Sequence, residues 1–136
     1  MSSHDAPRAV LDTNVLVAAG FRPRSASGRL AAAVRDGRLL ALWTEATRAE
    51  AVSVLGRIPP LRPADLGALF PEAGQVQLLL DSDRFDRVPG PADRTFAALA
   101  SAAGAPLVTA DAPLAEGARA HGVDVRAPSE AARSLL

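Results

Sequence analysis

The sequence contains no cysteine, no lysine and no tyrosine, and aromatic residues make up only 4% of its 136 residues. The absence of cysteine excludes disulfides, thiolate zinc sites and cysteine nucleophiles. With so few aromatic side chains, no base-stacking platform of the single-strand-binding type is visible. The 15 basic residues are all arginines, and 15 acidic residues balance them to a net charge of zero. This balance argues against a protein that coats nucleic acid by bulk attraction.

Long apolar runs are also missing. No stretch approaches the roughly 18 to 20 consecutive apolar residues that a membrane span requires. The start of the chain, MSSHDAPRAV, lacks the basic segment and apolar run of a signal peptide. We therefore expect no membrane association and a cytoplasmic location. The length, with 49% hydrophobic and 22% charged residues, predicts one globular domain over residues 1–136.

Short apolar runs alternate along the chain with alanine-rich helical patterns. They predict strands over residues 8–11, 38–43, 85–88, 106–109 and 123–126. They predict helices over residues 25–36, 44–57, 91–103, 113–121 and 128–136, a turn or short helix after the first strand, and two short helices between residues 63 and 83, broken near Pro71. Ser25 or Ser27 is expected to cap the first long helix, and Thr44 the next. This alternation predicts an α/β fold with a mainly parallel sheet and helices on both faces.

Four acidic residues stand at positions that favour a metal site. Asp12 in VLDTN and Asp111 in LVTAD each follow a predicted strand, and ligands of such sheets bind outside the carboxyl ends of the strands. If the two strands are neighbours, both carboxylates project into one crevice. Asp93 lies in the first turn of a predicted helix, and Glu50 lies mid-helix between two alanines. Four oxygen donors without cysteine or histidine nearby indicate a hard cation such as Mg²⁺ or Mn²⁺.

Each acid also has an ordinary structural explanation. Asp12 and Asp111 can cap the element that follows them. Asp93 can be a favourable charge at a helix N-terminus, and Glu50 can be an exposed helical residue. The hypothesis of a metal site therefore depends on the four acids in combination.

The motifs around these acids resemble those of the PIN-domain family. The matching stretches are AVLDTNVLVAA, RAEAVSVLGR and PADRTFAALASAAGAPLVTADAPL, and the similarity spans residues from about Val10 to Val125. The spacing RSASGRL…DGRLLALW…E…VLGR is similar to that of a toxin-like branch of the family. The resemblance implies a three-layer α/β/α fold and a divalent-metal-dependent endoribonuclease that hydrolyses phosphodiester bonds.

The resemblance also assigns roles to individual residues. It implies an acidic quartet that binds Mg²⁺ or Mn²⁺ and performs catalysis, namely Asp12, Glu50, Asp93 and Asp111. It implies that Asn14 and Thr109 are polar supports of this quartet. It further implies RNA as the substrate, single-stranded RNA being favoured and DNA remaining open, with a homodimer and an antitoxin protein as partners.

Phosphate contacts are expected from arginines. Arg22 and Arg24, in the segment FRPRS, lead into a predicted helix N-terminus, which suits anion contact, and Arg29 lies in that helix. Arg48 and Arg94 are secondary candidates. The alternative for each of them is an ordinary solvated surface arginine.

Two other protein families also place aspartates at the ends of strands. Response-regulator receivers and haloacid-dehalogenase-like phosphatases rely on a lysine near the phosphoryl group, and this chain has none. The phosphatase DxD pattern is missing as well, because Thr13 and Asn14 follow Asp12. The alternative of a PIN-like domain that binds RNA or protein without cutting it remains open. Many relatives carry an acid three residues before the position of Asp93, where this sequence has Gly90, and its loss favours a weak or inactive site.

Overall fold

A single parallel sheet organises the part of the chain that the computed structural model describes, residues 6–58 and 66–136. Its strands lie in the order β2-β1-β3-β4, and all neighbouring pairs are parallel. The strands are β1 (Arg8–Leu11), β2 (Leu40–Ala41), β3 (Leu107–Val108) and β4 (Val125–Arg126). Val10 of β1 lies beside Leu107 of β3, so the strands that precede Asp12 and Asp111 are neighbours. The predicted mainly parallel sheet is confirmed.

Helices connect the strands. In the described ranges they are α1 (Thr13–Phe21), α2 (Ala26–Arg35), α3 (Glu45–Gly56), α5 (Pro91–Ala103), α6 (Ala112–Ala120) and α7 (Pro128–Leu135). Ser25 caps α2 by accepting a hydrogen bond from the Gly28 N–H, and Thr44 caps α3 in the same way, as the sequence predicts. None of these helices is long and apolar enough to cross a membrane.

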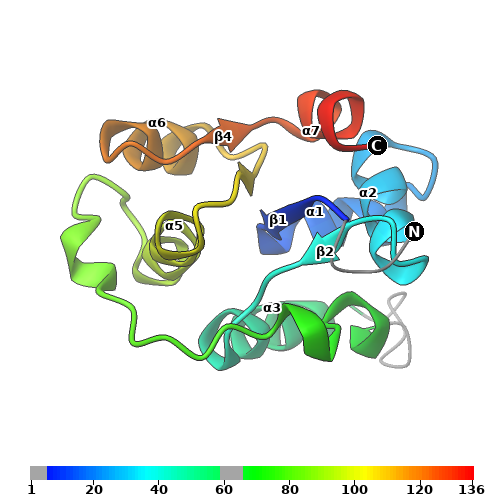
Figure 1. Cartoon of the computed structure of the whole chain (residues 1–136), viewed down its shortest axis with the longest axis horizontal. Helices are drawn as coiled ribbons and strands as arrows, with labels where there is room; N and C mark the ends of the chain where they lie inside the picture. The colour runs from blue at the N-terminus through cyan, green and yellow to red at the C-terminus, as the bar shows by residue number, and fades with distance from the viewer. Residues whose placement is uncertain (1–5, 59–65) are drawn as a thin grey trace.

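Two apolar cores cover the two faces of the sheet. Alternate residues of a strand point to opposite faces, and β1 follows this rule. Ala9 and Leu11 enter a core with α1, α2, α7 and part of α3, whereas Val10 enters a second core with α5 and α6. Figure 1 shows α2 and α5 on opposite sides of the strands. The predicted three-layer α/β/α fold is confirmed.

The predicted strand over residues 85–88 is wrong. A short 3₁₀ helix (Ser82–Arg84) leads into a turn, in which the Val88 N–H donates to the Phe85 carbonyl at 3.0 Å. Phe85 and Val88 are both buried in the second core. Apolar residues three apart share one side of a turn, whereas a strand alternates sides.

Where the first of the two helices predicted between residues 63 and 83 was expected, the described backbone is helical at Leu66 and in the 3₁₀ turn Gly67–Leu69. In place of the second helix, after Pro71, the described backbone has single-turn 3₁₀ helices at Glu72–Gly74 and Ser82–Arg84. Residues 63–65 lie outside the described ranges. The backbone after Gly74 is instead drawn to β2, where Trp43 and Gln75 form a parallel bridge. Tertiary pairing therefore replaces the expected helix.

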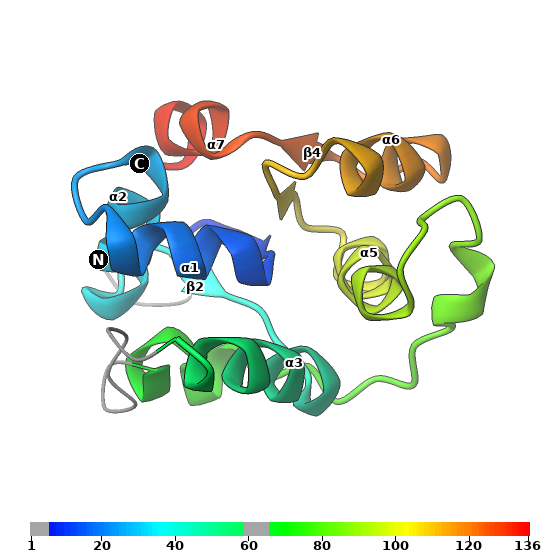
Figure 2. The ribbon, with the colours of Figure 1, turned by 180° about the vertical axis from the view of Figure 1, so that it is seen from behind.

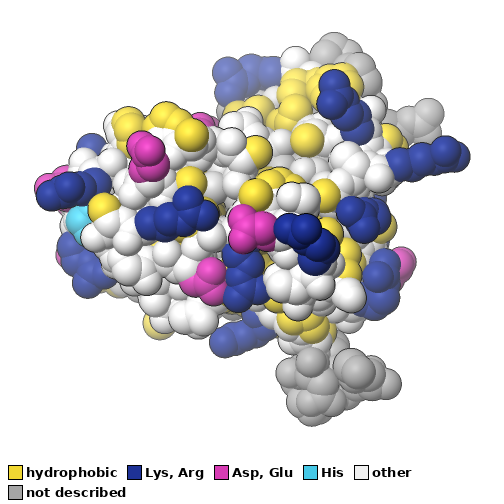
Figure 3. Space-filling view, turned by 90° about the horizontal axis from the view of Figure 1, so that it is seen from above, with side chains coloured by type: hydrophobic (Ala, Val, Ile, Leu, Met, Phe, Trp, Pro, Cys, Tyr) yellow, Lys and Arg dark blue, Asp and Glu magenta, His cyan; other side chains and the backbone are white. Residues whose placement is uncertain are grey.

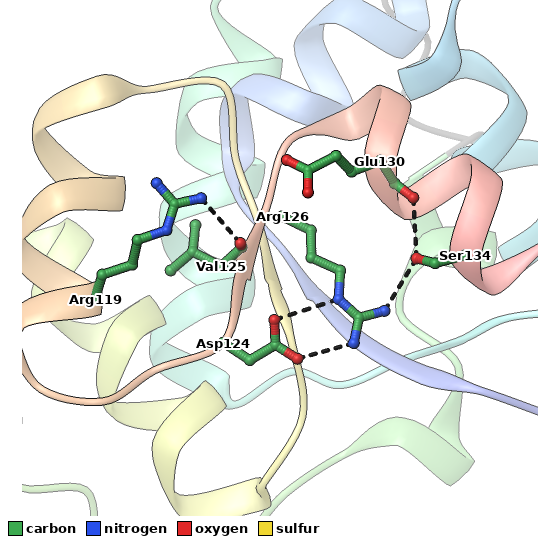
Figure 4. Close-up of polar contacts among 6 residues, drawn as sticks. All are labelled: Arg119, Asp124, Val125, Arg126, Glu130 and Ser134. Atoms are coloured by element: carbon green, nitrogen blue, oxygen red, sulfur yellow. Dashed lines mark hydrogen bonds and ion pairs between the residues drawn. The ribbon is translucent and has the colours of Figure 1, made fainter.

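An arginine network joins β4 to α7 at one edge of the sheet (Figure 4). Arg126 donates to both carboxylate oxygens of Asp124, at 3.3 and 2.8 Å, and to the Ser134 hydroxyl in α7 at 3.0 Å. Arg119 of α6 donates to the Val125 carbonyl at 3.0 Å. The side chains therefore satisfy a carbonyl of the edge strand and hold the last helix against it.

Candidate metal centre

Asp12 directly follows β1 and is the most buried acid of the predicted quartet, with 2% of its surface exposed. It occupies the N-cap position of α1, but its side chain makes no capping hydrogen bond. Its Oδ2 instead accepts a hydrogen bond from Thr109 Oγ1 at 2.8 Å. Burial raises the pKa of the Asp12 carboxyl, against the lowering effect of the Thr109 hydroxyl and of the nearby Asn14 and Thr13 backbone. A plain capping role therefore does not explain Asp12.

Thr109 connects the ends of the two central strands. It is buried directly after β3, and its hydroxyl accepts a hydrogen bond from the Asp111 N–H at 3.0 Å while donating to Asp12. Asp111 caps α6, because its Oδ1 accepts from the Leu114 N–H at 3.0 Å. The ordinary explanation of Asp111 as a cap thus holds. The same geometry also orients its carboxylate beside Asp12, whose pKa the Asp111 charge helps to raise.

Asp93 and Glu50 approach from two other helices. Asp93 is the third residue of α5 and is partly buried. Burial, together with the smaller effects of the charges on Asp12, Asp111 and Glu50 in that order, raises its pKa to about 6. Glu50 lies on α3 and is partly buried, and the next residue, Ala51, is fully buried. Asp93 therefore lies close enough to the other three predicted acids for their charges to affect its pKa.

The donor set fits a hard divalent cation in charge and chemistry. It consists of carboxylate oxygens, the ligands that Mg²⁺ and Mn²⁺ prefer. Among the described residues, however, no three His, Asp or Glu side chains converge closely enough to share an ion as they stand. Burial is the main cause of the raised pKa of Asp93, and repulsion by the neighbouring carboxylates adds to it. A cation would remove this repulsion, and the side chains would have to rotate toward it.

The chain was compared with models of known protein families. The model of the PIN domain matches residues 8–113, which is well over half of the chain. This chain belongs to the PIN domain family. The matched range includes all four acids together with Asn14 and Thr109. PIN domains are in general nucleases that act on nucleic acids with divalent metals. A search of curated proteins found no match.

Two residues of the DTN motif of this PIN domain stand at the start of α1. Asn14 is exposed beside Asp12, so its amide is available to a ligand at the acid cluster. Thr13 is buried, and its hydroxyl has no hydrogen-bond partner within the described ranges. Sequence reasoning gave Thr13 no role. Its position next to Asp12 is the only signal that pointed to it.

The arginines predicted to bind substrate do not line the acid cluster of the PIN domain. Arg22 and Arg24 lie beyond the far end of α1, whose nine residues extend roughly 13 Å from Asp12 at 1.5 Å per residue. Figure 2 shows α1 running outward from the centre of the molecule. Arg29 is exposed on α2. These three arginines therefore remain predicted contacts for phosphates away from the acid cluster.

The other arginines of the described ranges form no continuous basic stripe on the face that carries α6 and α7. There, arginines are scattered among acidic and apolar side chains (Figure 3). Arg94 donates to the Val88 carbonyl at 2.7 Å, and Arg48 lies over the ring of Phe70. Both secondary candidates thus have structural contacts of their own.

Gly90 is the N-cap of α5 and lies against the Asp93 carboxylate. A Cβ at this position would lie 3.3 Å from Asp93 Oδ2, so a larger side chain would press on that carboxylate. The acid that many relatives carry here would therefore change the position of Asp93 as well as adding a charge.

We expect Thr109→Val to lower Mn²⁺ affinity and Mn²⁺-dependent cleavage by about 10-fold to 100-fold, the usual cost of losing a group that orients a metal ligand. The substitution keeps the buried shape but removes both hydrogen bonds of the hydroxyl. Calorimetric titration with Mn²⁺ measures the affinity. Thr95→Val is the matched control, because the Thr95 hydroxyl contacts only its own helix, at the Pro91 carbonyl. Equal Mn²⁺ affinity in both variants would rule out the orienting role.

The raised pKa of Asp93 predicts that the stability of the metal-free protein falls as the pH rises, whereas the stabilisation by Mn²⁺ grows. The pKa rises from 3.8 to about 6 on folding, so the metal-free protein loses stability as the pH rises through this range. Mn²⁺ needs the ionised carboxylate, so the increase in Tm that Mn²⁺ causes should grow over the same range. Thermal melts from about pH 4 to about pH 7.5 measure both trends. In Asp93→Asn both should flatten, and an unchanged profile would contradict the assignment.

Proposed function

We propose that this PIN domain is a divalent-metal-dependent endoribonuclease. The observation that carries the proposal is the unit formed by Asp12, Thr109 and Asp111 at the ends of two neighbouring strands. Asp93 lies near this unit, because the charges of Asp12, Asp111 and Glu50 all contribute to raising its pKa. A concentration of negative charge at the ligand-binding edge of a parallel sheet suits a cation that in turn binds a phosphate.

Asp12, Glu50, Asp93 and Asp111 would hold one or two Mg²⁺ or Mn²⁺ ions. When bound, such ions position the scissile phosphate and lower the pKa of an attacking water. The protein's part is orientation. The Thr109 hydroxyl fixes the direction of the Asp12 carboxylate, and the capping bond to the Leu114 N–H fixes that of Asp111.

RNA is the proposed substrate, single-stranded RNA before DNA. The proposal follows from the similarity of the motif spacing to the toxin-like branch of the family. A role as the toxin of a toxin–antitoxin pair, with a small antitoxin protein as partner, follows from the same similarity. A short reading frame next to that of this chain would support it.

A binding-only PIN domain is the second candidate. Gly90 favours it, because the position lacks a carboxylate that could help to hold a second ion. Such a domain would still bind metal and RNA but would not cleave the RNA.

Cleavage of end-labelled single-stranded RNA and DNA with Mn²⁺ or Mg²⁺ separates these candidates. The control is the double variant Asp12→Asn/Asp93→Asn, purified in parallel. Metal-dependent cutting that disappears in the control is the expected result, with RNA cut in preference to DNA. A folded protein that binds Mn²⁺ and RNA but cuts neither polymer would favour the binding-only domain. Cutting that persists in the control would assign it to a contaminant.

A further inference from the structure

One side of α1 leads from the acid cluster to an exposed aromatic ring. Asn14 is exposed beside Asp12, and Phe21, the last residue of the helix, is 54% exposed. These two residues are about two turns of helix apart, so their side chains lie on the same side of α1, roughly 10 Å from each other along its axis. Val17 and Ala18, which lie between them on this side, are only partly buried. An accessible surface therefore connects the candidate metal centre with Phe21.

The arginine loop, Phe21–Arg24, continues this surface, and its backbone is firmly held. Every residue of the loop is exposed. The Arg22 carbonyl accepts hydrogen bonds from the Ser25 hydroxyl at 2.6 Å and from the Ser25 N–H at 3.0 Å. Pro23 packs closely on α2, because a Cβ at Gly28 would lie 2.1 Å from the Pro23 carbonyl oxygen. The loop therefore presents its exposed side chains from a fixed backbone.

The surface around this loop carries charge of one sign. Residues 13–35 contain no acidic residue and four exposed arginines, Arg22, Arg24, Arg29 and Arg35. Within the described ranges, none of these arginines forms an ion pair with a carboxylate. Phe21 is also the only exposed phenylalanine or tryptophan of the described ranges. Aromatic rings that stack on bases, beside cations that contact phosphates, are the groups that bind single-stranded nucleic acid. The unpaired positive charge therefore favours an RNA strand over an apolar protein partner.

We propose that the arginine loop is a second contact site for the RNA strand that the acid cluster holds, a proposal that rests on the nuclease function proposed above. Phe21 stacks on one unpaired base, and Arg22 and Arg24 contact the phosphates beside that base. A distance of roughly 10 Å along α1 corresponds to about three nucleotides at a spacing of about 3.4 Å. The stacked base therefore lies about three nucleotides from the scissile phosphate. A single ring is enough for this contact, although the chain has no wider stacking platform.

Fluorescence anisotropy of a labelled single-stranded RNA of about 12 nucleotides, within the usual site size of single-strand binders, tests the stacking contact. Without added metal, so that no RNA is cut, Phe21→Ala should weaken binding by about 5-fold to 150-fold. Phe21→Leu keeps an apolar side chain but has no ring, so it should bind as weakly as Phe21→Ala, whereas Phe21→Trp should bind like the natural chain. Leu79→Ala, at a fully exposed apolar residue of another segment, is the matched control. Equal affinity of Phe21→Ala and the natural chain, or a natural chain that binds no RNA, overturns the proposal.

The salt dependence of the same binding tests the arginines. Each lost phosphate contact on a single strand should lower the slope of log K against log salt by about 0.7, so Arg22→Gln/Arg24→Gln should lower it by about 1.4. Arg38→Gln is the matched control, because Arg38 lies beyond the far end of α2 and is paired with Asp36. A slope that the double variant leaves unchanged overturns the phosphate contacts.

Cleavage in Mn²⁺ distinguishes a failure of this proposal from a failure of the proposed nuclease. Phe21→Ala should raise KM for the long RNA more than it lowers kcat, because the ring binds the strand away from the scissile phosphate. A natural chain that binds RNA through Phe21 but cuts no RNA supports the contact site and contradicts the nuclease. A natural chain and a Phe21→Ala variant that cut the long RNA with equal KM support the nuclease and overturn the contact site.

Discussion

Asp12→Asn is expected to lower metal-dependent cleavage by at least about 100-fold, while making the metal-free protein more stable at neutral pH. Substitutions that only disturb a ligand's orientation already cost about 10-fold to 100-fold, so loss of a ligand charge should cost more. The stability gain has a separate cause. Burial raises the pKa of Asp12, so its ionised form opposes folding near pH 7. Asparagine removes that charge and can still accept from Thr109.

Parallel assays of cleavage and thermal stability measure both effects on one preparation. Glu72→Gln removes an exposed acid away from the quartet and is the matched control, expected to change neither quantity appreciably. The combination of lower activity with a higher metal-free Tm is specific, because a merely damaged fold would lower both. A variant that retains the activity of the natural sequence would show that Asp12 does not hold the catalytic metal.

Gly117→Ala is expected to destabilise the fold by about 3 kcal/mol, the upper range for forced overpacking. A Cβ at Gly117 of α6 would lie 2.4 Å from the Arg87 carbonyl oxygen and 2.9 Å from the Val88 Cα. Both are backbone atoms, so the helix or the segment that leads to α5 must move. Because that segment positions Asp93, cleavage should also fall. The expected shift in Tm is roughly 10 °C downward.

Gly56→Ala is the matched control for this prediction. It lies at the end of α3, and nothing surrounds the position within 4 Å of the added Cβ. Alanine there should be neutral or stabilising by up to about 1 kcal/mol, because it favours the helix. If Gly117→Ala melts at the same temperature as Gly56→Ala, α6 does not lie as close to the backbone at Arg87 as described above.

The positions of Asp12 and Asp111 could be predicted, because this prediction requires only two facts. A parallel sheet brings the carboxyl ends of its strands to one edge. Asp12 directly follows β1, and Asp111 comes three residues after the end of β3. The direction of each side chain could not be predicted in the same way. Asp12 turns toward Thr109, whereas Asp111 caps its helix, and this difference arises from contacts between residues 97 positions apart.

The arginines show where local reasoning fails. The apolar run after Asp12 forms the nine-residue helix α1, because its alanines and valines pack into the first core, and Arg22 and Arg24 lie beyond its far end, away from the acids. The turn at Phe85 and Val88 differs from the predicted strand for a similar reason. A short apolar run takes its conformation from the surface that it covers.

Mn²⁺ binding by the single variants Asp12→Asn, Glu50→Gln, Asp93→Asn and Asp111→Asn tests most directly whether four separate elements build one cation site. Calorimetric titration of each variant, beside the natural sequence and Glu72→Gln, gives the affinity and the number of ions bound. Each of the four substitutions should weaken Mn²⁺ binding by about 10-fold or more, and the control should bind as the natural sequence does. Unchanged affinity in all four variants would contradict the acidic quartet and place the metal elsewhere.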